Sequence, residues 1–372
     1  MDEILDLALT LSEGKEATAS AIQRVSQKTN PSASAWAFGQ WDLRKRAKGK
    51  FQLAEKMLFV REALEQATHE SVAEYHASLF PRDVLVADLT TGIGADLIGL
   101  SRRGPTKGFE LDAERLSCAR NNLEVHGLAS SLELRDSLGA TWDFEYAYAD
   151  PARRIEGRRT LDPTEFEPNP LEIADRFTKI KLGVMKLSPL LPDTFLESLG
   201  SHLEFISFGG ECREALVLLG SEAVPGRYAV HVESGQRLEE GNPRVTTCVP
   251  SEFLLDLDPA AVRAHCAGTL CEKFEATPLG DSNGYLTSDL QSKSVWFRSY
   301  RILYEGKGDV KSTKQAVREL GGDVFEVKQR GVKGDVHKLK RELSLKGKLP
   351  LSLVLWPDGQ KVRHLLVTSL DL

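Results

Sequence analysis

The sequence contains no apolar run that approaches the roughly 20 residues needed to cross a bilayer. Its first ten residues, MDEILDLALT, are acidic where a secretory signal is basic, so we expect no such signal. None of the five cysteines belongs to a CxxC pair or stands near a matching histidine or cysteine pair. We therefore expect free thiols, a reducing cytoplasmic environment and no metal site. The cysteines are Cys118, Cys212, Cys248, Cys266 and Cys271.

A third glycine is missing from the most informative stretch, residues 84–96, which reads VLVADLTTGIGAD. The pattern predicts a buried parallel strand, a glycine turn and the start of a helix. Phosphate-binding dinucleotide sites carry GxGxxG, whereas Gly92 and Gly94 are followed by Asp96 at the helix start. A carboxylate there disfavours a pyrophosphate, which argues against a Rossmann dehydrogenase. Two glycines alone would also suit an ordinary strand-to-helix turn.

Polar residues follow the next three predicted strands. Residues 106–111 end in Glu110, placed to bind ribose hydroxyls about 20 residues after the glycine turn. Leu132–Leu134 leads into Asp136 and Ser137, which we expect at the edge of an adenine. Residues 144–149 lead into a DPARR motif at residues 150–154. The pattern therefore suits a ligand with adenine and ribose but no phosphate, such as S-adenosylmethionine.

These four segments resemble the motifs of class I S-adenosylmethionine-dependent methyltransferases. Residues 84–154 are also similar to the core of trimethylguanosine synthases, and the whole chain resembles bacterial methyltransferases with a C-terminal THUMP-like domain and a DPARR motif. The resemblance implies S-adenosyl-L-methionine as cofactor. The cofactor-binding residues that it implies are Asp88, Thr90, Gly92, Gly94, Asp96, Glu110, Leu111, Asp136, Ser137 and Asp150.

The resemblance places catalysis at the fourth motif, on Asp150, Pro151, Arg153 and Arg154. Enzymes that methylate amines carry [DNS]PP[YFW] here, so Asp150 and Pro151 keep only the first half. Asp150 is a candidate general base or a carboxylate facing the sulfonium. The two arginines are candidates to stack on a base, to hold a phosphate or carboxylate, or to close the loop through a salt bridge.

We expect an α/β protein with a Rossmann-like, seven-stranded methyltransferase sheet, an N-terminal helical domain and a C-terminal α/β THUMP-like domain. The predicted boundaries are residues 1–80 for the helical domain, 81–249 for the methyltransferase domain, 250–290 for a connecting segment and 291–372 for the THUMP-like domain. The last three predicted strands of the main sheet are residues 180–187, 203–208 and 215–219. Because ligands of such sheets lie at the carboxyl ends of the strands, we expect Lys186, Ser188, Glu211 and Arg213 near the substrate side. Glu65, Gln66 and Thr68 are further candidates to face the active site. Helical spacing is predicted over residues 17–27 and 51–79, and a single helix over 259–274.

Positive charge gathers in two regions. Residues 291–372 hold 17 Lys and Arg against 9 Asp and Glu, a balance of +8. Since the whole chain has a net charge of −6, residues 1–290 have a net charge of −14. Five basic residues also lie within residues 44–50, beside Trp41 and Phe51. Both regions suit RNA phosphates, and both also suit ordinary solvated surfaces. The C-terminal basic residues of interest are Lys328, Arg330, Lys333, Lys338, Lys340 and Arg341.

Three functional interpretations follow. The first is a methyltransferase acting on a base of tRNA or rRNA, with RNA as partner and no membrane association. The second is a methyltransferase acting on a protein or a small molecule. The third is a non-catalytic adaptor that binds RNA or protein, against which the intact set of motif residues speaks.

Overall fold

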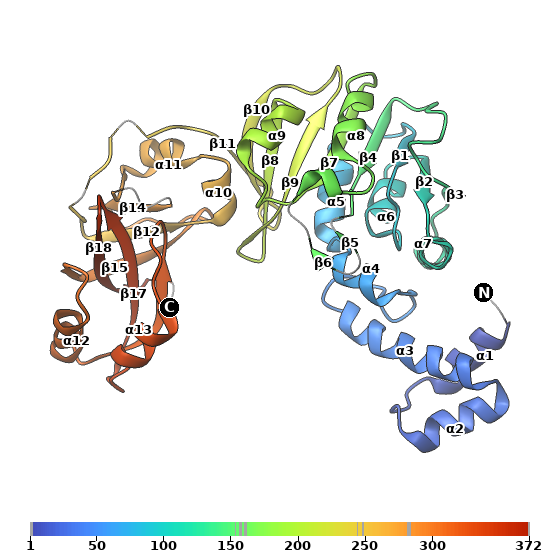
Figure 1. The fold of residues 1–372 in the computed structure, drawn as a ribbon, viewed down its shortest axis with the longest axis horizontal. Coiled ribbons are helices and arrows are strands. Elements are labelled where there is room, and N and C mark those ends of the chain that lie inside the picture. Colours follow the sequence, from blue (N-terminus) through green and yellow to red (C-terminus); the bar gives the residue numbers. More distant parts are fainter. Residues whose placement is uncertain are drawn as a thin grey trace. The chain divides into compact units, whose positions relative to one another are not determined.

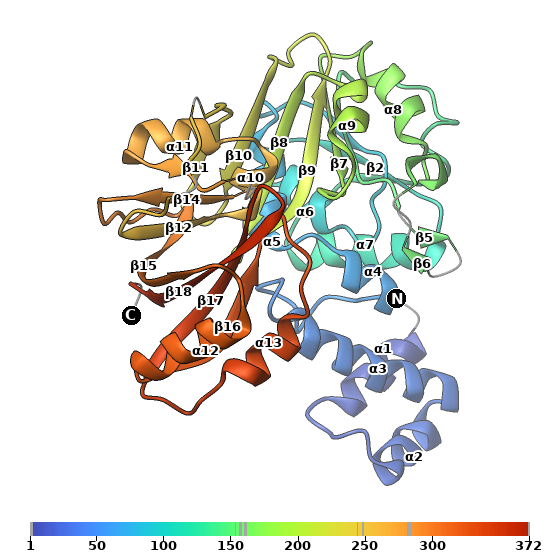
Figure 2. The same ribbon diagram turned by 60° about the vertical axis from the view of Figure 1, so that its left-hand side comes forward.

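The computed structural model describes residues 3–152, 154, 155, 158, 159, 162–243, 245–247, 249–280 and 284–370. It divides into two compact units (Figures 1 and 2). The first unit comprises Met1–Lys186 and Leu218–Ala223, and the second comprises Leu187–Val217 and Val224–Leu372. Among the described residues, no helix is both long and apolar enough to span a membrane.

The first unit begins with five helices. They are α1 (Glu3–Ser12), α2 (Ala19–Lys28), α3 (Pro31–Ala47), α4 (Arg61–Gln66) and α5 (Glu70–Ser78). The side chains of Thr18 and Asn30 cap α2 and α3 by accepting hydrogen bonds from backbone N–H groups, and Pro31 occupies the first turn of α3. Small and apolar residues such as Ala37 and Val25 pack α1, α2 and α3 together.

The predicted helix over residues 51–79 is wrong in its first part. Phe51–Val60 forms turns and extended backbone, and the helix that precedes it is α3, which includes most of the basic segment. Side-chain amides compete for this backbone: Gln40 bonds both the N–H and C=O of Phe59, at 3.0 and 2.8 Å. Asn122 does the same for Leu58, at 2.8 and 3.0 Å. These bonds replace a helical ladder and let apolar residues of the segment enter the core.

The strands of the first unit are parallel, in the order β7-β4-β1-β2-β3. Their bounds are β1 (Val86–Asp88), β2 (Thr106–Glu110), β3 (Ser131–Leu134), β4 (Tyr146–Ala149) and β7 (Leu182–Leu187). Between them lie α6 (Ala95–Ser101), α7 (Ala113–Val125), β5 (Arg154–Ile155), β6 (Arg158–Arg159), the 3-10 helix η1 (Pro163–Glu165) and α8 (Pro170–Phe177). Alternating strands and helices thus bring the ends of β1, β2, β3 and β4 to one edge, as predicted.

The second unit continues with α9 (Asp193–Leu199), β8 (His202–Phe208), β9 (Glu211–Leu219), β10 (Gly226–His231) and β11 (Gln236–Glu239), in the strand order β11-β10-β8-β9. All seven predicted strands of the methyltransferase sheet are present, and β10 and β11 raise the described number to nine. β10 runs parallel to β8, and β11 pairs antiparallel with β10 through a short turn. The turn includes Gly235 at φ +66°, a local signal that the sequence interpretation missed.

A second sheet of seven strands follows the order β13-β14-β12-β15-β18-β17-β16. The elements are β12 (Phe253–Leu257), α10 (Pro259–Arg263), α11 (Ala267–Phe274), β13 (Thr277–Pro278), β14 (Tyr285–Ser288), β15 (Phe297–Gly306), α12 (Val310–Glu319), β16 (Gly322–Gln329), α13 (Val336–Leu343), β17 (Leu349–Asp358) and β18 (Lys361–Ser369). The helix predicted over 259–274 is divided into α10 and α11, because His265 at φ +57° interrupts it. The helices α12 and α13 lie beside β16 of this sheet (Figure 2). Their residues Ala316 and Leu343 pack with strand residues such as Leu353.

Candidate functional site

The glycine turn joins β1 to α6 in a conformation that needs glycine twice. Gly92 and Gly94 have φ of +56° and +87°. A side chain at Gly94 would start only 3.2 Å from the Cα of Ala119, so the turn also packs closely against α7. The turn therefore holds its backbone N–H groups in a fixed arrangement at the sheet edge.

Glu110, at the end of β2, is fixed against this turn. One of its carboxylate oxygens accepts the N–H of Gly92 at 2.7 Å, and the other accepts the N–H groups of Leu111 and Asp112, both at 2.9 Å. A carboxylate has about four acceptor sites, so a ligand hydroxyl can still bond to it. Leu111 beside it is 69% exposed, an uncommon position for leucine.

Asp88, at the end of β1, is buried with incomplete partners. One oxygen accepts the N–H of Thr90 at 3.1 Å, and Oδ2 has no hydrogen-bond partner among the described residues. Burial raises the pKa of Asp88 well above its usual value, and the charges of Asp96, Asp150 and Glu110 raise it further. A buried acceptor of this kind is stabilised when a donor or cation reaches it.

Thr90 connects the first and fourth strand ends. Its hydroxyl accepts the backbone N–H of Asp150 at 2.6 Å. Thr90, a predicted cofactor residue of the first motif, therefore fixes the backbone at Asp150, where the fourth motif begins. Pro151 is buried beside it.

Asp96 lies in the interior, with protein partners on both oxygens. It accepts the hydroxyl of Thr68 at 2.8 Å and lies 2.8 Å from Nδ1 of His76. His76 is itself fully buried and stacks on Tyr148 at 5.3 Å between ring centroids. Burial acts to raise the pKa of Asp96, but the hydrogen bond and charge of His76, with Lys186 and Thr68, outweigh burial and lower it.

Lys186, near the end of β7, joins this interior group to the fourth motif. Its ammonium lies 2.6 Å from the carboxylate of Asp150 and donates to the hydroxyl of Thr68 at 3.0 Å. Lys186 is buried, whereas the Asp150 side chain is 30% exposed. A polar line thus runs from His76 through Asp96, Thr68 and Lys186 to the partly open carboxylate of Asp150, and we call it the polar line.

Sequence reasoning found only parts of the polar line. It placed Lys186 on the substrate side by topology and noted Thr68 as a residue that could face the active site, but it overlooked His76 and Tyr148. A histidine three residues before the last residue of a predicted apolar helix gives no local signal of a partner in α6. The contact depends on tertiary packing of α5 on α6, where Gly99 lets the helices approach: a side chain there would lie 2.7 Å from the C=O of Ala73.

The remaining predicted site residues lie as follows. After β3, Asp136 is exposed and accepts the N–H of Leu138 at 2.9 Å, while Ser137 is buried. Arg153 lies outside the described residues. Arg154 belongs to the two-residue strand β5, and its neighbour Ala152 bonds to the backbone of Glu167, which closes the base of the loop that follows the fourth motif.

The second unit contains three residues predicted near the substrate side. Ser188 is buried, and its hydroxyl accepts the N–H of Leu190 at 3.3 Å. Glu211 and Arg213 form an exposed ion pair at 2.9 Å, and Arg213 also donates to the C=O of Phe208. These contacts occupy the polar groups within the turn and its flanking strands.

Metal and cysteine chemistry find no support in the part of the chain that the structure describes. No group of three or more metal-ligating side chains occurs there. The described cysteines, Cys118, Cys212, Cys266 and Cys271, are free thiols. Burial raises the pKa of Cys118 to about 12, which makes it a poor nucleophile at neutral pH. Cys248 lies outside the described residues.

The two basic regions differ in how many charges the fold itself engages. In α3, Arg44 is buried and donates to the C=O of Met57 at 2.8 Å. Just after α3, Lys50 donates to the C=O groups of Leu64 and Ala67, both at 2.8 Å. In the second unit, Lys328 and Arg330 pair with Asp256 at 3.2 and 2.8 Å. Lys333, Lys338, Lys340 and Arg341, in and before α13, are exposed.

A parallel sheet with a glycine turn and acids at its strand ends is typical of α/β enzymes that bind an adenosine-containing cofactor. A family model described as THUMP domain-like matches residues 297–369. Over 329 residues the chain is 30% identical to an uncharacterized S-adenosylmethionine-dependent methyltransferase of Mycobacterium tuberculosis, found in strains CDC 1551 and H37Rv. The matched region covers 85% of this chain and 91% of the relative. The chain belongs to the S-adenosylmethionine-dependent methyltransferases.

The fold agrees with this family. The structure matches the crystal structure of a candidate methyltransferase from Porphyromonas gingivalis W83 with a TM-score of 0.79 at 20% identity, covering 99% of this chain and 98% of that chain. The protein is therefore an enzyme that uses S-adenosylmethionine. The residues at the sheet edge fit this cationic, phosphate-free cofactor, because Asp88 offers a buried carboxylate oxygen that has no hydrogen-bond partner among the residues that the structure describes.

Proposed function

We propose that the enzyme methylates a base of tRNA or rRNA, with the acceptor held at Asp150. The observation that carries the transfer centre is the 2.6 Å pair between Asp150 and buried Lys186 at the edge that also holds the glycine turn. The partly exposed carboxylate can meet an acceptor, whereas the lysine cannot. The resemblance of the sequence to trimethylguanosine synthases and to DPARR methyltransferases supports this proposal.

The proposed cofactor contacts follow from the strand ends. Glu110 binds the ribose hydroxyls, Asp136 and Ser137 lie at the adenine, and Asp88 meets the cofactor's ammonium group. The backbone at Gly92 and Gly94 approaches the amino-acid tail. The other members of the proposed set are Leu111, Thr90, which acts through Asp150, and Asp96, which acts from the interior through the polar line.

S-adenosylmethionine supplies a methyl group already activated on a sulfonium, so the protein mainly positions the acceptor and excludes water. Lys186 pairs with Asp150 and fixes the orientation of its carboxylate, since the ammonium group of Lys186 is held in turn by Thr68. Asp150 can then accept a hydrogen bond or a proton from the attacking atom. Pro151 shapes the floor of this site, and Arg153 and Arg154 are proposed to bind a phosphate or stack on a base.

RNA is proposed as the acceptor because of α13 and the residues before it. Four basic side chains are exposed there, in the region matched by the THUMP domain-like model. Such a surface neutralises phosphates irrespective of sequence. We also propose that the chain has four parts, with boundaries at residues 80, 249 and 290. The proposed location is the cytoplasm, where free thiols stay reduced.

The test uses the full chain with radiolabelled S-adenosylmethionine and total RNA from a strain that lacks the gene, beside a protein extract of the same strain. We expect label in RNA. Asp150→Ala should lower the rate by about 100-fold or more, the usual scale for a positioned polar group, and leave cofactor affinity within several-fold. Label in protein alone would favour the second interpretation, and an unchanged rate for Asp150→Ala would move the chemistry elsewhere.

A further inference from the structure

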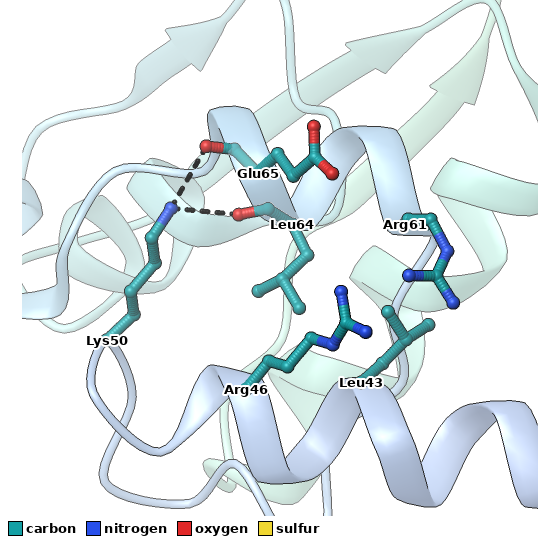
Figure 3. A pocket seen from close by; sticks show the side chains of 6 residues that line it. All are labelled: Leu43, Arg46, Lys50, Arg61, Leu64 and Glu65. Carbon is teal, nitrogen blue, oxygen red and sulfur yellow. Dashed lines mark hydrogen bonds between the residues drawn. The ribbon is translucent and has the colours of Figure 1, made fainter.

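A groove of about 340 Å³ lies between α3 and α4, separate from the residues discussed at the sheet edge. Figure 3 shows its lining: Leu43, Arg46 and Lys50 from α3 and the residues just after it, and Arg61, Leu64 and Glu65 from α4. The two leucines are buried and form an apolar floor. The rim therefore carries nearly all of the groove's charge.

Two guanidinium groups converge at this rim from different helices (Figure 3). Arg46 and Arg61 both bind the same oxygen of Asp42, at 3.1 and 3.6 Å. Their side chains are 57% and 50% exposed. Exposed ion pairs of this kind contribute little to stability, so a ligand anion can replace or share Asp42 at small cost. One carboxylate serving two arginines also leaves donors available, because each guanidinium has five N–H groups.

The charges of the groove sum to a small positive value. Arg46, Lys50 and Arg61 are balanced in part by Glu65 and Asp42, which leaves +1. A phosphodiester carries a single negative charge, whereas a terminal phosphate carries nearly two. Paired planar guanidiniums also match the geometry of phosphate oxygens better than ammonium groups do. The groove thus suits one phosphodiester of a nucleic-acid backbone.

The groove is connected to the transfer centre through a short piece of chain. Lys50 binds the C=O groups at the end of α4, and Thr68, just beyond, donates to Asp96 and accepts from Lys186. Leu64 and Thr68 are four residues apart, so their Cα atoms are separated by at most about 14 Å. The end of α4 is thus linked to the groove through Lys50 and to Asp150 through Thr68 and Lys186.

We propose that the α3–α4 groove binds a backbone phosphate of the RNA strand close to the methylated nucleotide, through Arg46 and Arg61. This inference rests on the proposed RNA substrate and gives it a second contact, distinct from α13. It also changes which basic residues matter: Arg46 binds RNA together with Arg61, which lies outside the basic stretch of residues 44–50, while Arg44 and Lys50 serve the fold.

The experiment measures binding of unmodified tRNA and rRNA fragments to the full chain by filter binding between 50 and 200 mM salt. Arg46→Gln/Arg61→Gln should weaken binding by about tenfold at the lower salt and reduce the slope of log K against log salt by about 0.7 to 0.9, the contribution of one lost phosphate contact. Asp42→Asn should act in the opposite direction and tighten binding several-fold, because it frees both guanidiniums.

The matched control is Arg24→Gln/Lys28→Gln, which removes two exposed charges from α2 of the same unit. It should leave the slope nearly unchanged. If both double variants bind RNA alike, the groove is overturned and the RNA substrate stands. If the wild-type chain shows no salt-dependent RNA binding, both proposals fail. If Arg46→Gln/Arg61→Gln lowers the melting temperature, the Asp42→Asn variant still tests the proposal. Unchanged or weaker RNA binding by Asp42→Asn would contradict a phosphate site in the groove.

Discussion

Asp88 and Asp96 lie on either side of the glycine turn, and both are buried carboxylates, yet the protein treats them in opposite ways. Asp96 has a hydroxyl on one oxygen and an imidazole on the other. Asp88 accepts one backbone N–H, and its other oxygen has no hydrogen-bond partner in the part of the chain that the structure describes. Accordingly the pKa of Asp96 is lowered and that of Asp88 is raised. The difference separates an acid whose two oxygens are both bonded within the protein from one with an oxygen that the described residues leave unbonded.

The two acids differ in their partners because their side chains lie against different elements of the fold. Asp96 belongs to the first turn of α6, which packs against α5, where His76 and the preceding Thr68 meet it. Asp88 ends β1 among other acids, and within the described residues its carboxylate accepts a hydrogen bond only from the N–H of Thr90, in its own turn. Leaving a buried carboxylate half-satisfied costs stability, and natural proteins keep such costs mainly where function needs them.

The largest effect should come from removing the satisfied acid. Asp96→Asn leaves His76 without its carboxylate and breaks the polar line at its centre, which should lower the free energy of unfolding by about 3–5 kcal/mol, the usual range when one partner of a buried pair is lost. Urea unfolding of the purified protein measures it. Combining Asp96→Asn with His76→Gln should cost less than the two changes added, since they share one interaction. Simple additivity would show that the two side chains act independently.

The contrast between these acids also marks what sequence could predict. Strand ends at one edge follow from alternating strands and helices, so Asp88, Glu110 and Asp150 could be placed together in advance. The glycine positions were equally readable, because only glycine accepts φ +87° without strain. The seven main strands could also be predicted, because they are short and largely apolar runs of sequence.

The rest depends on contacts between segments far apart in the chain. His76 meets Asp96 only once α5 packs on α6, and no local pattern encodes this. Gln40 and Asn122 hold the backbone of residues 58 and 59 in extended form, against a helical apolar spacing. Basic residues posed the same difficulty: Arg44 and Arg46 are alike in the sequence, yet one is buried against Met57 and the other lines a groove.

The second prediction concerns the unsatisfied acid, and its sign is reversed. Asp88→Asn removes a buried carboxyl whose ionisation the fold disfavours, so the cofactor-free protein should become more stable at neutral pH, by about 1–2 kcal/mol. Cofactor affinity should fall by about tenfold or more in isothermal titration with S-adenosylhomocysteine, because the amide cannot pair with an ammonium group. Glu110→Gln is the control, expected to weaken binding without stabilising the protein. A destabilised Asp88→Asn with unchanged affinity would remove the distinction between the two acids.

The smallest effect is the pH dependence of these two changes, and it separates them by window. Asp88 has a raised pKa in the folded state, so wild-type stability relative to Asp88→Asn is lost as pH rises from the unfolded value near 4 through the folded pKa. Asp96 has a lowered pKa, so its contribution is present above about pH 4 and is lost only as pH falls through the folded value. Between pH 4.5 and 7, the stability difference from wild type should therefore grow for Asp88→Asn, by at most about 1.4 kcal/mol per pH unit, and stay flat for Asp96→Asn. Unfolding curves of the three proteins at four pH values test this, and a flat difference for Asp88→Asn would mean that the carboxyl is matched by partners in the folded protein after all.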